Sequence, residues 1–415
     1  MERHNGRMSF AVNHGRRSWS VGPLSDTTGA RAGYCLVLVL LCVALCAQCV
    51  GADRRERGAG DQKPVRIGIA GLVMLHADGF LRAVSKRDDV SVVGIFEPDP
   101  AVRRKFAERY KLPDSLFFTD LAAMLERTKP EAVTVFSNTY DHLMVAQICS
   151  AHRIGVITME KPLAVNMEHA RAIRAAASSS HMQVIVNYIP TWYPSMRATW
   201  DLIKTQHAAG DIRKMVALDG IPGPKKLSFP PEFVEWVTDP TRAGGGALFD
   251  FACLGANLMT WLMDNERPTS VTALLQQMQP QLYPRVDDEA TVLLEYPRAQ
   301  GLIQASWNWP FPRKDFEVYG ENGYAIATGE TSLRVRLPNT AEELRTPAQL
   351  PADERDMISY LAAVTRGRLK SSGPSSIENG MIVMEILEAA RQSAQSGKKV
   401  VLSGDSPAGP TSPRK

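Results

Sequence analysis

Short apolar runs alternate with helical patterns between residues 65 and 160, and this alternation restricts the fold more than any other feature of the chain. The runs that predict strands are residues 65–70, 90–96, 132–136 and 154–159. Helical patterns fall between or after them, at residues 80–86, 101–110, 121–127 and 142–151. Because parallel strands joined by helices form a doubly wound sheet, the sequence predicts an α/β Rossmann domain over residues 64–182.

The pattern changes from about residue 183, where segments with period-two alternation predict antiparallel strands. These segments are residues 271–277, 290–295, 301–306 and 317–319. Residues 376–396 carry Ile, Met and Leu at helical spacing and predict a helix that packs back on the sheet. Since 415 residues exceed most single cores, we expect a second, α+β domain at residues 183–402 with a large, mostly antiparallel open sheet. The Pro-, Ser- and Gly-rich residues 403–415 predict a disordered tail.

The first 52 residues are typical of an export signal. A basic stretch with Arg16, Arg17 and Arg31 precedes an apolar run at residues 34–47, and small residues follow at 50–52. The run is shorter than the roughly 20 residues that cross a membrane, so an uncleaved anchor is the alternative. The sequence predicts a signal peptide at residues 1–52, a polar linker at residues 53–63, and an exported protein that is periplasmic or extracellular.

The cysteines argue against a metal site, and the net charge argues against a nucleic-acid partner. Four of the six cysteines lie in or beside the leader, which leaves Cys149 and Cys253 in the body. Two isolated cysteines form neither a metal cluster nor a disulfide framework, so no metal site is predicted. The net charge is +4, and the leader, with five arginines against Glu2 and Asp26, leaves only about +1 for the rest of the chain. Without a basic face, we expect no nucleic-acid partner.

Polar residues follow the predicted strands in a fixed order. The tripeptide Glu160-Lys161-Pro162 comes directly after residues 154–159, and a glycine turn at Gly71, an acidic strand end at Glu97 and a polar turn with His142 precede it. A glycine-rich run ends later at Asp250. The tripeptide alone is a weak signal, since a lysine before proline is often a solvated turn. In an open α/β sheet, however, ligands bind where the strands end.

This order and spacing resembles the glucose-fructose oxidoreductase, inositol dehydrogenase and MocA family (Gfo/Idh/MocA) over residues 65–402. Its members mostly oxidise or reduce sugars and polyols with a nicotinamide cofactor. The resemblance implies an NAD(P)-dependent oxidoreductase that acts on a hydroxyl of a sugar, sugar acid or polyol. It also implies a homo-oligomer built on the exposed faces of the second-domain sheets. Because free NAD is scarce outside the cytoplasm, an exported member is expected to keep its cofactor bound.

The glycine turn is an incomplete dinucleotide fingerprint. Counted from Gly71, the second and third glycines of G-x-G-x-x-G are replaced by Val73 and His76. Some family members carry a Gly-Leu-x-x-x-His version, which this turn matches. Glu97, at the end of the second strand, favours NAD over NADP because a carboxylate accepts bonds from ribose hydroxyls and repels a 2′-phosphate. The predicted cofactor residues here are Gly68, Gly71, Leu72, His76 and Glu97, and the alternative is a structural turn without a ligand.

The turn after residues 132–136 corresponds to the family's Thr-Pro-Asn-x-x-His turn beside the nicotinamide. Thr139 replaces the asparagine, and His142 is retained. A histidine that opens a helix is as often a cap or packing residue. The resemblance adds Ser137, Thr139, His142, Glu160 and Lys161 to the predicted cofactor set.

The residues for proton transfer are where the chain departs from the family. The resemblance places Lys161 at the reacting hydroxyl, and the usual acid or base histidine, four residues after Asp250, is Leu254. Asn257 stands where many members have a second aspartate. Proton transfer then passes to Lys161, if burial beside a cationic nicotinamide lowers its pKa toward neutrality, or to Tyr188. Asp250 holds a substrate hydroxyl or orients Lys161.

Two aromatic runs are candidates for the substrate wall, because aromatic faces stack on sugar rings. The predicted substrate residues are Trp192, Tyr193, Asp250 and Trp307, with core packing as the alternative for each aromatic ring. A charged set is expected to be solvated or at an interface, without a catalytic role: Arg285, Asp287, Asp288, Arg313 and Lys314. Two alternative functions remain: an NAD-using, glycosidase-like enzyme with transient redox chemistry, and a non-catalytic sugar-binding protein.

Overall fold

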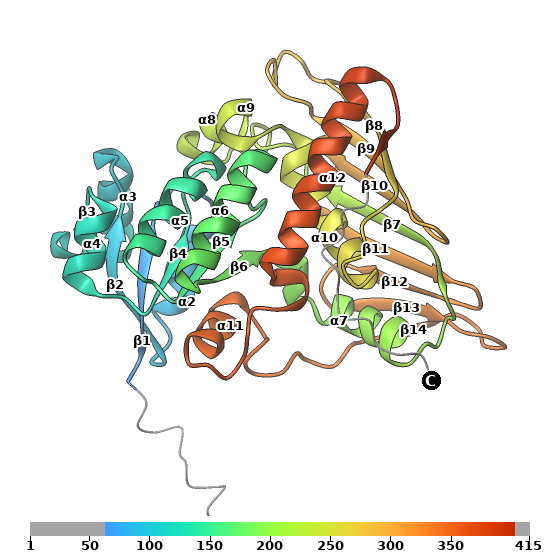
Figure 1. Cartoon of the computed structure of the whole chain (residues 1–415), viewed down its shortest axis with the longest axis horizontal. Helices are drawn as coiled ribbons and strands as arrows, with labels where there is room; N and C mark the ends of the chain where they lie inside the picture. The colour runs from blue at the N-terminus through green and yellow to red at the C-terminus, as the bar shows by residue number, and fades with distance from the viewer. Residues whose placement is uncertain (1–62, 403–415) are drawn as a thin grey trace, which may run out of the picture. The chain divides into compact units, whose positions relative to one another are not determined.

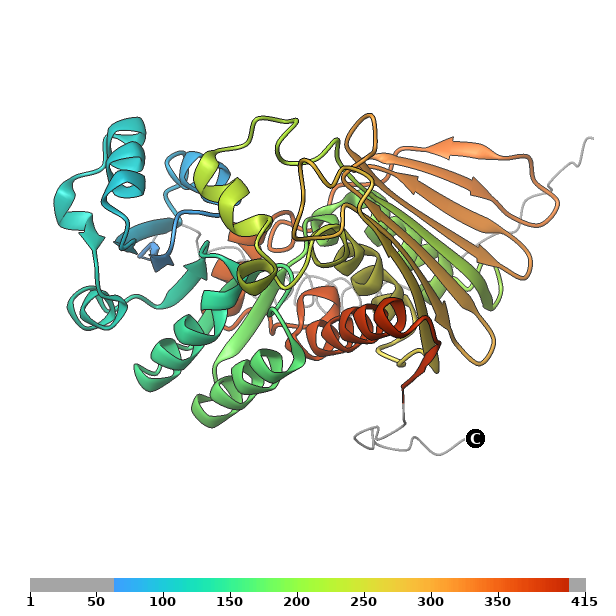
Figure 2. The same ribbon diagram turned by 90° about the horizontal axis from the view of Figure 1, so that it is seen from above.

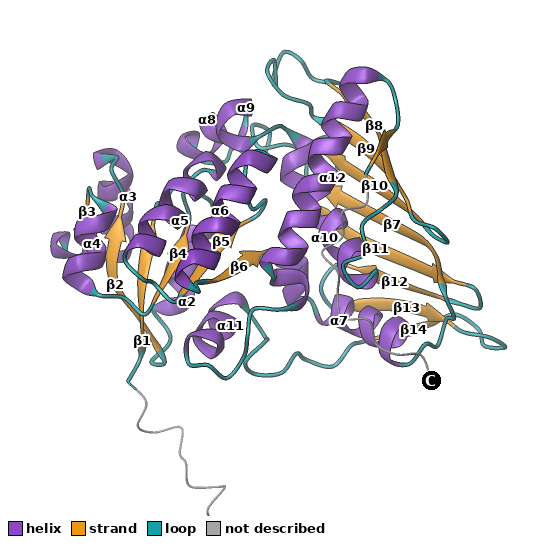
Figure 3. Cartoon of the chain, in the orientation of Figure 1, coloured by secondary structure: helices purple, strands orange, loops and turns teal. Residues whose placement is uncertain are grey.

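A six-stranded parallel sheet forms the first half of the computed structural model, which describes residues 63–402 (Figures 1 and 3). Its strand order is β3-β2-β1-β4-β5-β6. The strands are β1 (Val65–Ala70), β2 (Val90–Phe96), β3 (Phe117–Phe118), β4 (Ala132–Val135), β5 (Val156–Glu160) and β6 (Gln183–Asn187). The helices between them are α2 (His76–Val84), α3 (Pro100–Tyr110), α4 (Leu121–Thr128), α5 (His142–Ala151) and α6 (Met167–Ser180). The predicted Rossmann architecture is confirmed, whereas the predicted leader and tail, and the linker up to residue 62, lie outside the described residues.

Local sequence explains these elements. Every residue of β4 and β5 is buried, as expected for parallel strands covered on both faces. Helix α3 begins where the Asp99 carboxylate accepts the N–H groups of Ala101 and Val102, with proline at its first position. Strand β6 pairs in parallel with β5, so the parallel sheet continues to Asn187, past the expected boundary at residue 182.

A nine-stranded sheet forms the second half, in the order β14-β13-β12-β11-β7-β10-β9-β8-β15. Its neighbours are antiparallel except for the parallel pair β7 and β10, so the predicted mostly antiparallel sheet is confirmed. The strands are β7 (Ile212–Gly220), β8 (Ser270–Gln276), β9 (Glu289–Glu295), β10 (Gln300–Ser306), β11 (Arg313–Gly320), β12 (Tyr324–Thr328), β13 (Ser332–Arg336), β14 (Glu343–Arg345) and β15 (Val400–Val401).

Helices cover one face of this second sheet, as Figure 2 shows from above. The long helix α12 (Ile377–Ser396) agrees with the predicted helix and packs beside α10 (Cys253–Leu262). The other helices are α7 (Pro194–Trp200), α8 (Pro231–Val237), α9 (Pro240–Ala243) and α11 (Met357–Thr365), with shorter turns η2 (Thr139–Asp141), η3 (Ile189–Trp192), η5 (Leu248–Ala252) and η6 (Gly373–Ser375). Among residues 63–402, no helix is long and apolar enough to cross a membrane.

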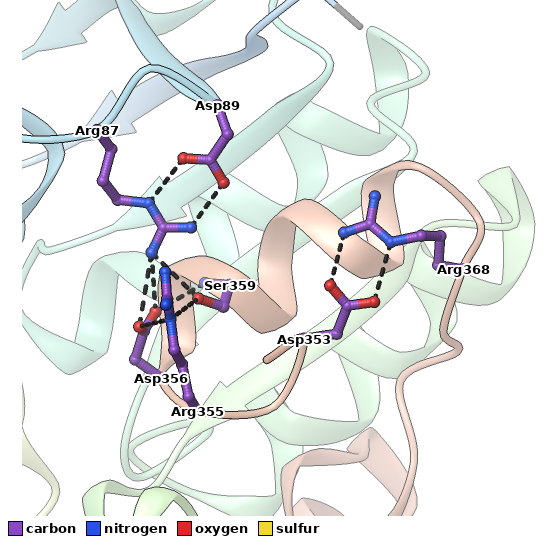
Figure 4. A network of polar contacts seen from close by, with 7 residues as sticks. All are labelled: Arg87, Asp89, Asp353, Arg355, Asp356, Ser359 and Arg368. Atoms are coloured by element: carbon purple, nitrogen blue, oxygen red, sulfur yellow. Dashed lines mark hydrogen bonds and ion pairs between the residues drawn. The ribbon is translucent and has the colours of Figure 1, made fainter. Parts of the chain in front are cut away.

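The chain returns from the second sheet to the parallel sheet through α11 and the loops around it. Arg87, in the loop before β2, binds Asp89 and donates to Ser359 of α11 at 3.0 Å, and Asp356 lies beside it (Figure 4). The Ser371 hydroxyl donates to the carbonyl of Val184 in β6 at 2.8 Å. These contacts join the two halves of the chain at the amino end of the parallel strands, since Arg87 precedes β2 and Val184 lies at the start of β6.

Candidate functional site

Lys161 lies directly after β5 and points to the second half of the chain. Its side chain is 8% exposed, and its ammonium donates to the Asp250 carboxylate oxygen Oδ1 and to the Asp250 carbonyl at 2.5 Å. The other carboxylate oxygen of Asp250 accepts the indole N–H of Trp307 at 2.9 Å. Asp250 therefore orients Lys161, which is one of the two roles predicted for it, and Trp307 orients Asp250.

The glycine-rich run explains how Asp250 reaches Lys161. Gly244 has a left-handed φ of +89°, and a Cβ at Gly246 would lie 1.8 Å from the carbonyl oxygen of Asp287. The Asp287 carboxylate accepts the N–H groups of Gly246 and Leu248 at 3.0 and 2.7 Å. Only glycine permits this close approach, which fixes the start of η5 and thereby the position of Asp250. Asp287 is thus a half-buried residue with a structural role, and not simply part of a solvated or interface charge set.

The protein groups around Lys161 do not by themselves lower its pKa. Burial lowers the pKa of the ammonium, but Asp250 and Glu160 more than compensate, and the pKa of Lys161 is raised above its ordinary value. Lys161 is therefore a cation that can stabilise negative charge on a substrate oxygen. As a proton acceptor it is poorly suited in this arrangement.

Glu160 anchors a chain of hydrogen bonds on the other side of Lys161. Its buried carboxylate accepts Asn187 Nδ2 at 2.7 Å and lies 2.8 Å from His76 Nδ1. Burial raises the pKa of Glu160, but His76, Asn187 and Lys161 together bring it below its ordinary value. An ionised Glu160 makes His76 the donor through Nδ1.

Trp192, predicted for the substrate wall, packs between Asn187 and Tyr360. Its indole N–H donates to Asn187 Oδ1 at 2.8 Å, and its ring lies 5.3 Å from that of Tyr360. It lines a separate pocket with Trp200, Trp261 and Tyr360. Trp307, also predicted for the wall, has no exposed surface, so it offers no aromatic face to a substrate.

The glycine turn after β1 has the features of an anion site. Gly71 adopts a φ of +84° and donates to the Phe96 carbonyl at 2.7 Å, and the turn leads into α2, whose first turn has no side-chain cap. No described residue accepts a hydrogen bond from the N–H groups of Val73, Leu75 or His76. Free amides at a helix N-terminus bind phosphate. The turn therefore fits the pyrophosphate of a dinucleotide.

Two other residues predicted near this turn have distinct roles. Glu97 is buried, and its carboxylate accepts the N–H groups of Leu72 and Asp99 at 2.8 and 3.0 Å, so it lies at the edge of the turn where a ribose binds. Gly68, predicted as a cofactor residue, lies inside β1. A Cβ there would lie 3.0 Å from the Met124 side chain and 3.3 Å from the Pro130 side chain. The absence of a side chain at Gly68 therefore lets α4 and the loop after it pack closely on β1.

The turn after β4 supplies a buried histidine. The His142 Nδ1 atom lies 3.1 Å from the carbonyl oxygen of Leu163, and its Nε2 atom has no hydrogen-bond partner among the described residues. Burial lowers the pKa of His142, so the ring is neutral and Nε2 is a free acceptor. Ser137 and Thr139 are buried in the same turn, and the Ser137 backbone packs against Gly71. This arrangement fits the predicted position beside the cofactor.

Tyr188, the predicted alternative for proton transfer, is fully buried. No described residue is hydrogen-bonded to its hydroxyl, and burial, together with Cys253, raises its pKa well above 10.0. A phenol in this environment keeps its proton and acts as a donor.

Leu254 and Asn257, the two positions expected to depart from the family pattern, both lie in α10. Leu254 is buried in α10 and carries no titratable group. The Asn257 amide donates to the Pro374 carbonyl at 2.6 Å and to Asn379 Oδ1 at 2.7 Å. Asn257 therefore ties α10 to α12.

Asp219 was not predicted from the sequence, and Lys314 was expected to belong to a charged set that is solvated or at an interface. Both belong to the second sheet, where Asp219 of β7 pairs directly with Lys314 of β11. Their positions carried a signal: each charge occupies the phase of its strand that otherwise holds buried residues such as Ala217 and Phe316. A charge in the buried phase of a strand is costly unless it is paired and hydrogen-bonded, so such a charge marks a candidate site.

Helix α8 lies against the glycine turn. The indole N–H of Trp236 donates to the Val73 carbonyl at 3.2 Å, and Glu232 forms an ion pair with Lys105 of α3. A segment between β7 and α10 thus packs on the first domain at the predicted cofactor edge.

Comparison with known proteins agrees with both halves of the chain. The profile of the oxidoreductase family with an NAD-binding Rossmann fold matches residues 65–188, and the GFO/IDH/MocA C-terminal domain matches residues 202–326. A dTDP-3,4-didehydro-2,6-dideoxy-α-D-glucose 3-reductase from Saccharopolyspora spinosa is 24% identical over 80% of this chain and 98% of its own length. A trans-1,2-dihydrobenzene-1,2-diol dehydrogenase from Xenopus laevis is 26% identical over 52% of this chain, and the match spans 61% of that enzyme.

Solved structures share the fold. An inositol dehydrogenase homologue from Azotobacter vinelandii, complexed with NAD+, superposes with a TM-score of 0.71 at 19% identity, covering 82% of this chain and 98% of that chain. An aldose–aldose oxidoreductase from Caulobacter crescentus, complexed with glycerol, superposes with a TM-score of 0.70 at 18% identity, covering 82% of this chain and all of that chain.

Proposed function

The chain belongs to the Gfo/Idh/MocA family of oxidoreductases and carries its NAD-binding Rossmann domain, and we propose that it oxidises or reduces a hydroxyl-bearing carbon of a sugar, sugar acid or polyol. The observation that carries the proposal is the Lys161–Asp250 ion pair at the end of β5. A buried ammonium, oriented by a carboxylate, lies where ligands of an open α/β sheet bind.

The residues of the first domain fit a dinucleotide. The free amides of the glycine turn would hold the pyrophosphate, and Glu97 would accept hydrogen bonds from the adenosine ribose. The nicotinamide, when bound, exchanges hydride with the carbinol carbon. Lys161 would donate to the substrate oxygen and stabilise negative charge on it.

The proposed substrate side combines charged groups with aromatic rings. Tyr193 is partly exposed and lies near the charges of Asp219 and Glu330. The indole N–H groups of Trp192 and Trp307 instead donate to Asn187 and Asp250. The Phe251 ring lies 5.3 Å from the Lys161 ammonium. This mixture of charges and aromatic rings supports a hydroxyl-rich substrate.

Nicotinamide analysis tests the proposal most directly. Purified protein is denatured, released nucleotide is identified by mass spectrometry, and NADH absorbance is followed against a panel of sugars, sugar acids and polyols. We expect NAD and not NADP, because the Glu97 carboxylate repels a 2′-phosphate. Failure to recover NAD or to bind it at millimolar supply would contradict the redox function and favour a sugar-binding protein.

The same assay separates the second enzymatic alternative. Tightly bound NAD with no net NADH formed, combined with release of a leaving group from a glycoside, would identify transient redox chemistry as in NAD-using glycosidases. Net conversion between NAD and NADH supports the dehydrogenase function proposed above.

We further propose that the protein is exported and retains its cofactor. Trp236 and the Lys105–Glu232 ion pair support retention, because they hold α8 against the glycine turn from which a cofactor would leave. Extensive dialysis should therefore leave NAD bound.

We also propose that the protein forms a homo-oligomer through the open face of the second sheet. Leu274 of β8 and Leu293 of β9 are 59% and 48% exposed on this face. Exposed apolar side chains on one sheet face are typical of an interface. Light scattering should show an oligomer for the natural chain and a smaller species for Leu293→Asp. The control is Leu227→Asp, which changes an exposed leucine in a loop; equal masses for all three proteins would contradict this interface.

A further inference from the structure

Asp219 and Lys314 occupy facing positions on two neighbouring strands. Asp219 is the penultimate residue of β7 and Lys314 the second residue of β11, and the two form a direct antiparallel pair. Asp219 is 3% exposed. Its side chain shares the face of β7 that carries Met215 and Ala217, where α10 covers the sheet.

Asp219 is buried and Lys314 is half-buried, and within the described part of the chain neither side chain has a hydrogen-bonded or ion-paired partner. Among residues 63–402, none donates a hydrogen bond to the Asp219 carboxylate, and none forms an ion pair with the Lys314 ammonium. Buried charges without partners are rare because burial without hydrogen bonds costs several kcal/mol. In enzymes, such groups occur where a ligand completes the set.

Both groups belong to the Lys161 site. The ammonium groups of Lys161 and Lys314 lie 5.3 and 5.6 Å from the centroid of the same ring, Phe251. The charge of Lys161 acts on Asp219, and the charge of Asp250 acts on Lys314. Asp219 therefore faces the same space as the lysine that is proposed to hold the substrate oxygen.

We propose that Asp219 is the proton acceptor for the reacting hydroxyl, in place of the histidine that Leu254 replaces, and that Lys314 is its positioning residue. The inference rests on the proposed function. In the oxidation, the hydroxyl O–H bond breaks and its proton goes to Asp219. The oxygen keeps that electron pair and forms the carbonyl as the carbon loses hydride to NAD, and the proton then passes to water. Reduction follows the reverse path.

The ionisation of these residues supports this assignment. Burial raises the pKa of Asp219 to about 8; the nearby charges of Lys314 and Lys161 lower it, and Asp315 raises it. Asp219 can thus bind and release a proton near neutral pH, which is what a general base requires. By contrast, the pKa values of Lys161 and Tyr188 are both raised above already basic values. Burial lowers the pKa of Lys314.

Asp219→Asn is the principal test. We expect kcat to fall about 100-fold or more, as for loss of a general base, with NAD affinity unchanged. The matched control is Glu317→Gln, the same chemical change on the opposite face of β11, which should keep wild-type kcat. Wild-type kcat in Asp219→Asn overturns the inference. If no variant, including the wild type, binds NAD, the proposed function fails as well.

The pH dependence of kcat in Lys314→Met distinguishes a positioning role of Lys314 from a purely structural one. Oxidation requires ionised Asp219, so kcat should rise with pH toward a plateau. Because Lys314 lowers the pKa of Asp219, its removal should move the midpoint of this rise to higher pH. A midpoint that does not move overturns the role of Lys314.

A third measurement is independent of turnover. The pKa of Asp219 is about 8 in the folded protein and 3.8 as the ordinary value, so the folded protein holds this proton more tightly than the unfolded chain does. Protonated Asp219 therefore makes its whole contribution to the free energy of unfolding below the unfolded pKa. That contribution is lost as the pH rises to about 8. Melting of the cofactor-free protein should therefore decline less over this range in Asp219→Asn than in the wild type. Parallel melting profiles would show that Asp219 is ionised throughout and overturn the inference.

Discussion

Replacing Lys161 with alanine should reduce kcat about 1,000-fold while NAD still binds. The ammonium is the cation at the carboxyl end of β5, and Asp250, itself held by Trp307, fixes its direction. Removing it takes away the donor to the substrate oxygen but leaves the glycine turn and Glu97 intact. NADH absorbance gives kcat, and quenching of protein fluorescence gives the dissociation constant of NAD.

Stability must be measured beside turnover for this variant. Removing one partner of a buried ion pair leaves Asp250 uncompensated, which costs about 3–5 kcal/mol. The double variant Lys161→Met with Asp250→Asn removes both charges and should recover much of the lost melting temperature without recovering activity. Lys161→Ala with wild-type turnover would exclude Lys161 from the reaction. A folded double variant without activity separates the chemical role from the structural one.

The fold was predictable because its determinants are local. Fully buried strands such as β4 and β5 appear as short apolar runs, and the half-buried strands β8 and β9 appear as alternation, so each segment reveals its own environment. The boundary at residue 182 failed because β6 is also an apolar run, and only its pairing with β5 assigns it to the first sheet.

The candidate site was predictable only where residues follow strands in order. Lys161 and Asp250 are far apart in sequence, and the order of motifs identified both, although not the ion pair between them. Trp192 and Trp307 could not be distinguished from substrate-facing aromatic rings, because their hydrogen bonds to Asn187 and Asp250 depend on tertiary contacts. For Asp219, the only sequence signal was a single charge in the buried phase of β7. It identifies a site only once the sheet pairing is known, because Lys314 of β11 then lies opposite Asp219.

Gly71→Ala should abolish most NAD binding, and Gly79→Ala, eight residues later, should not. Gly71 has a φ of +84°, and a Cβ there would lie 2.7 Å from the backbone nitrogen and Cα of Ser137. An alanine costs about 1–2 kcal/mol for the left-handed backbone alone, before the turn after β4 is displaced. Because the free amides and the Ser137 turn move together, we expect NAD affinity to fall at least about 100-fold, which corresponds to about 2.8 kcal/mol.

Gly79 is the matched control because it lies within α2 and nothing approaches its Cβ position within 4 Å. Alanine in a helix interior is favoured over glycine by about 1 kcal/mol, so Gly79→Ala should raise the melting temperature slightly and leave NAD affinity unchanged. Titration calorimetry with NAD, together with melting curves, checks both variants. If Gly71→Ala bound NAD as the natural chain does, the β1–α2 turn would not be the cofactor site, and the role of Glu97 at its edge would fail with it. If both variants lost NAD, the effect would come from α2 as a whole and not from the conformation of Gly71.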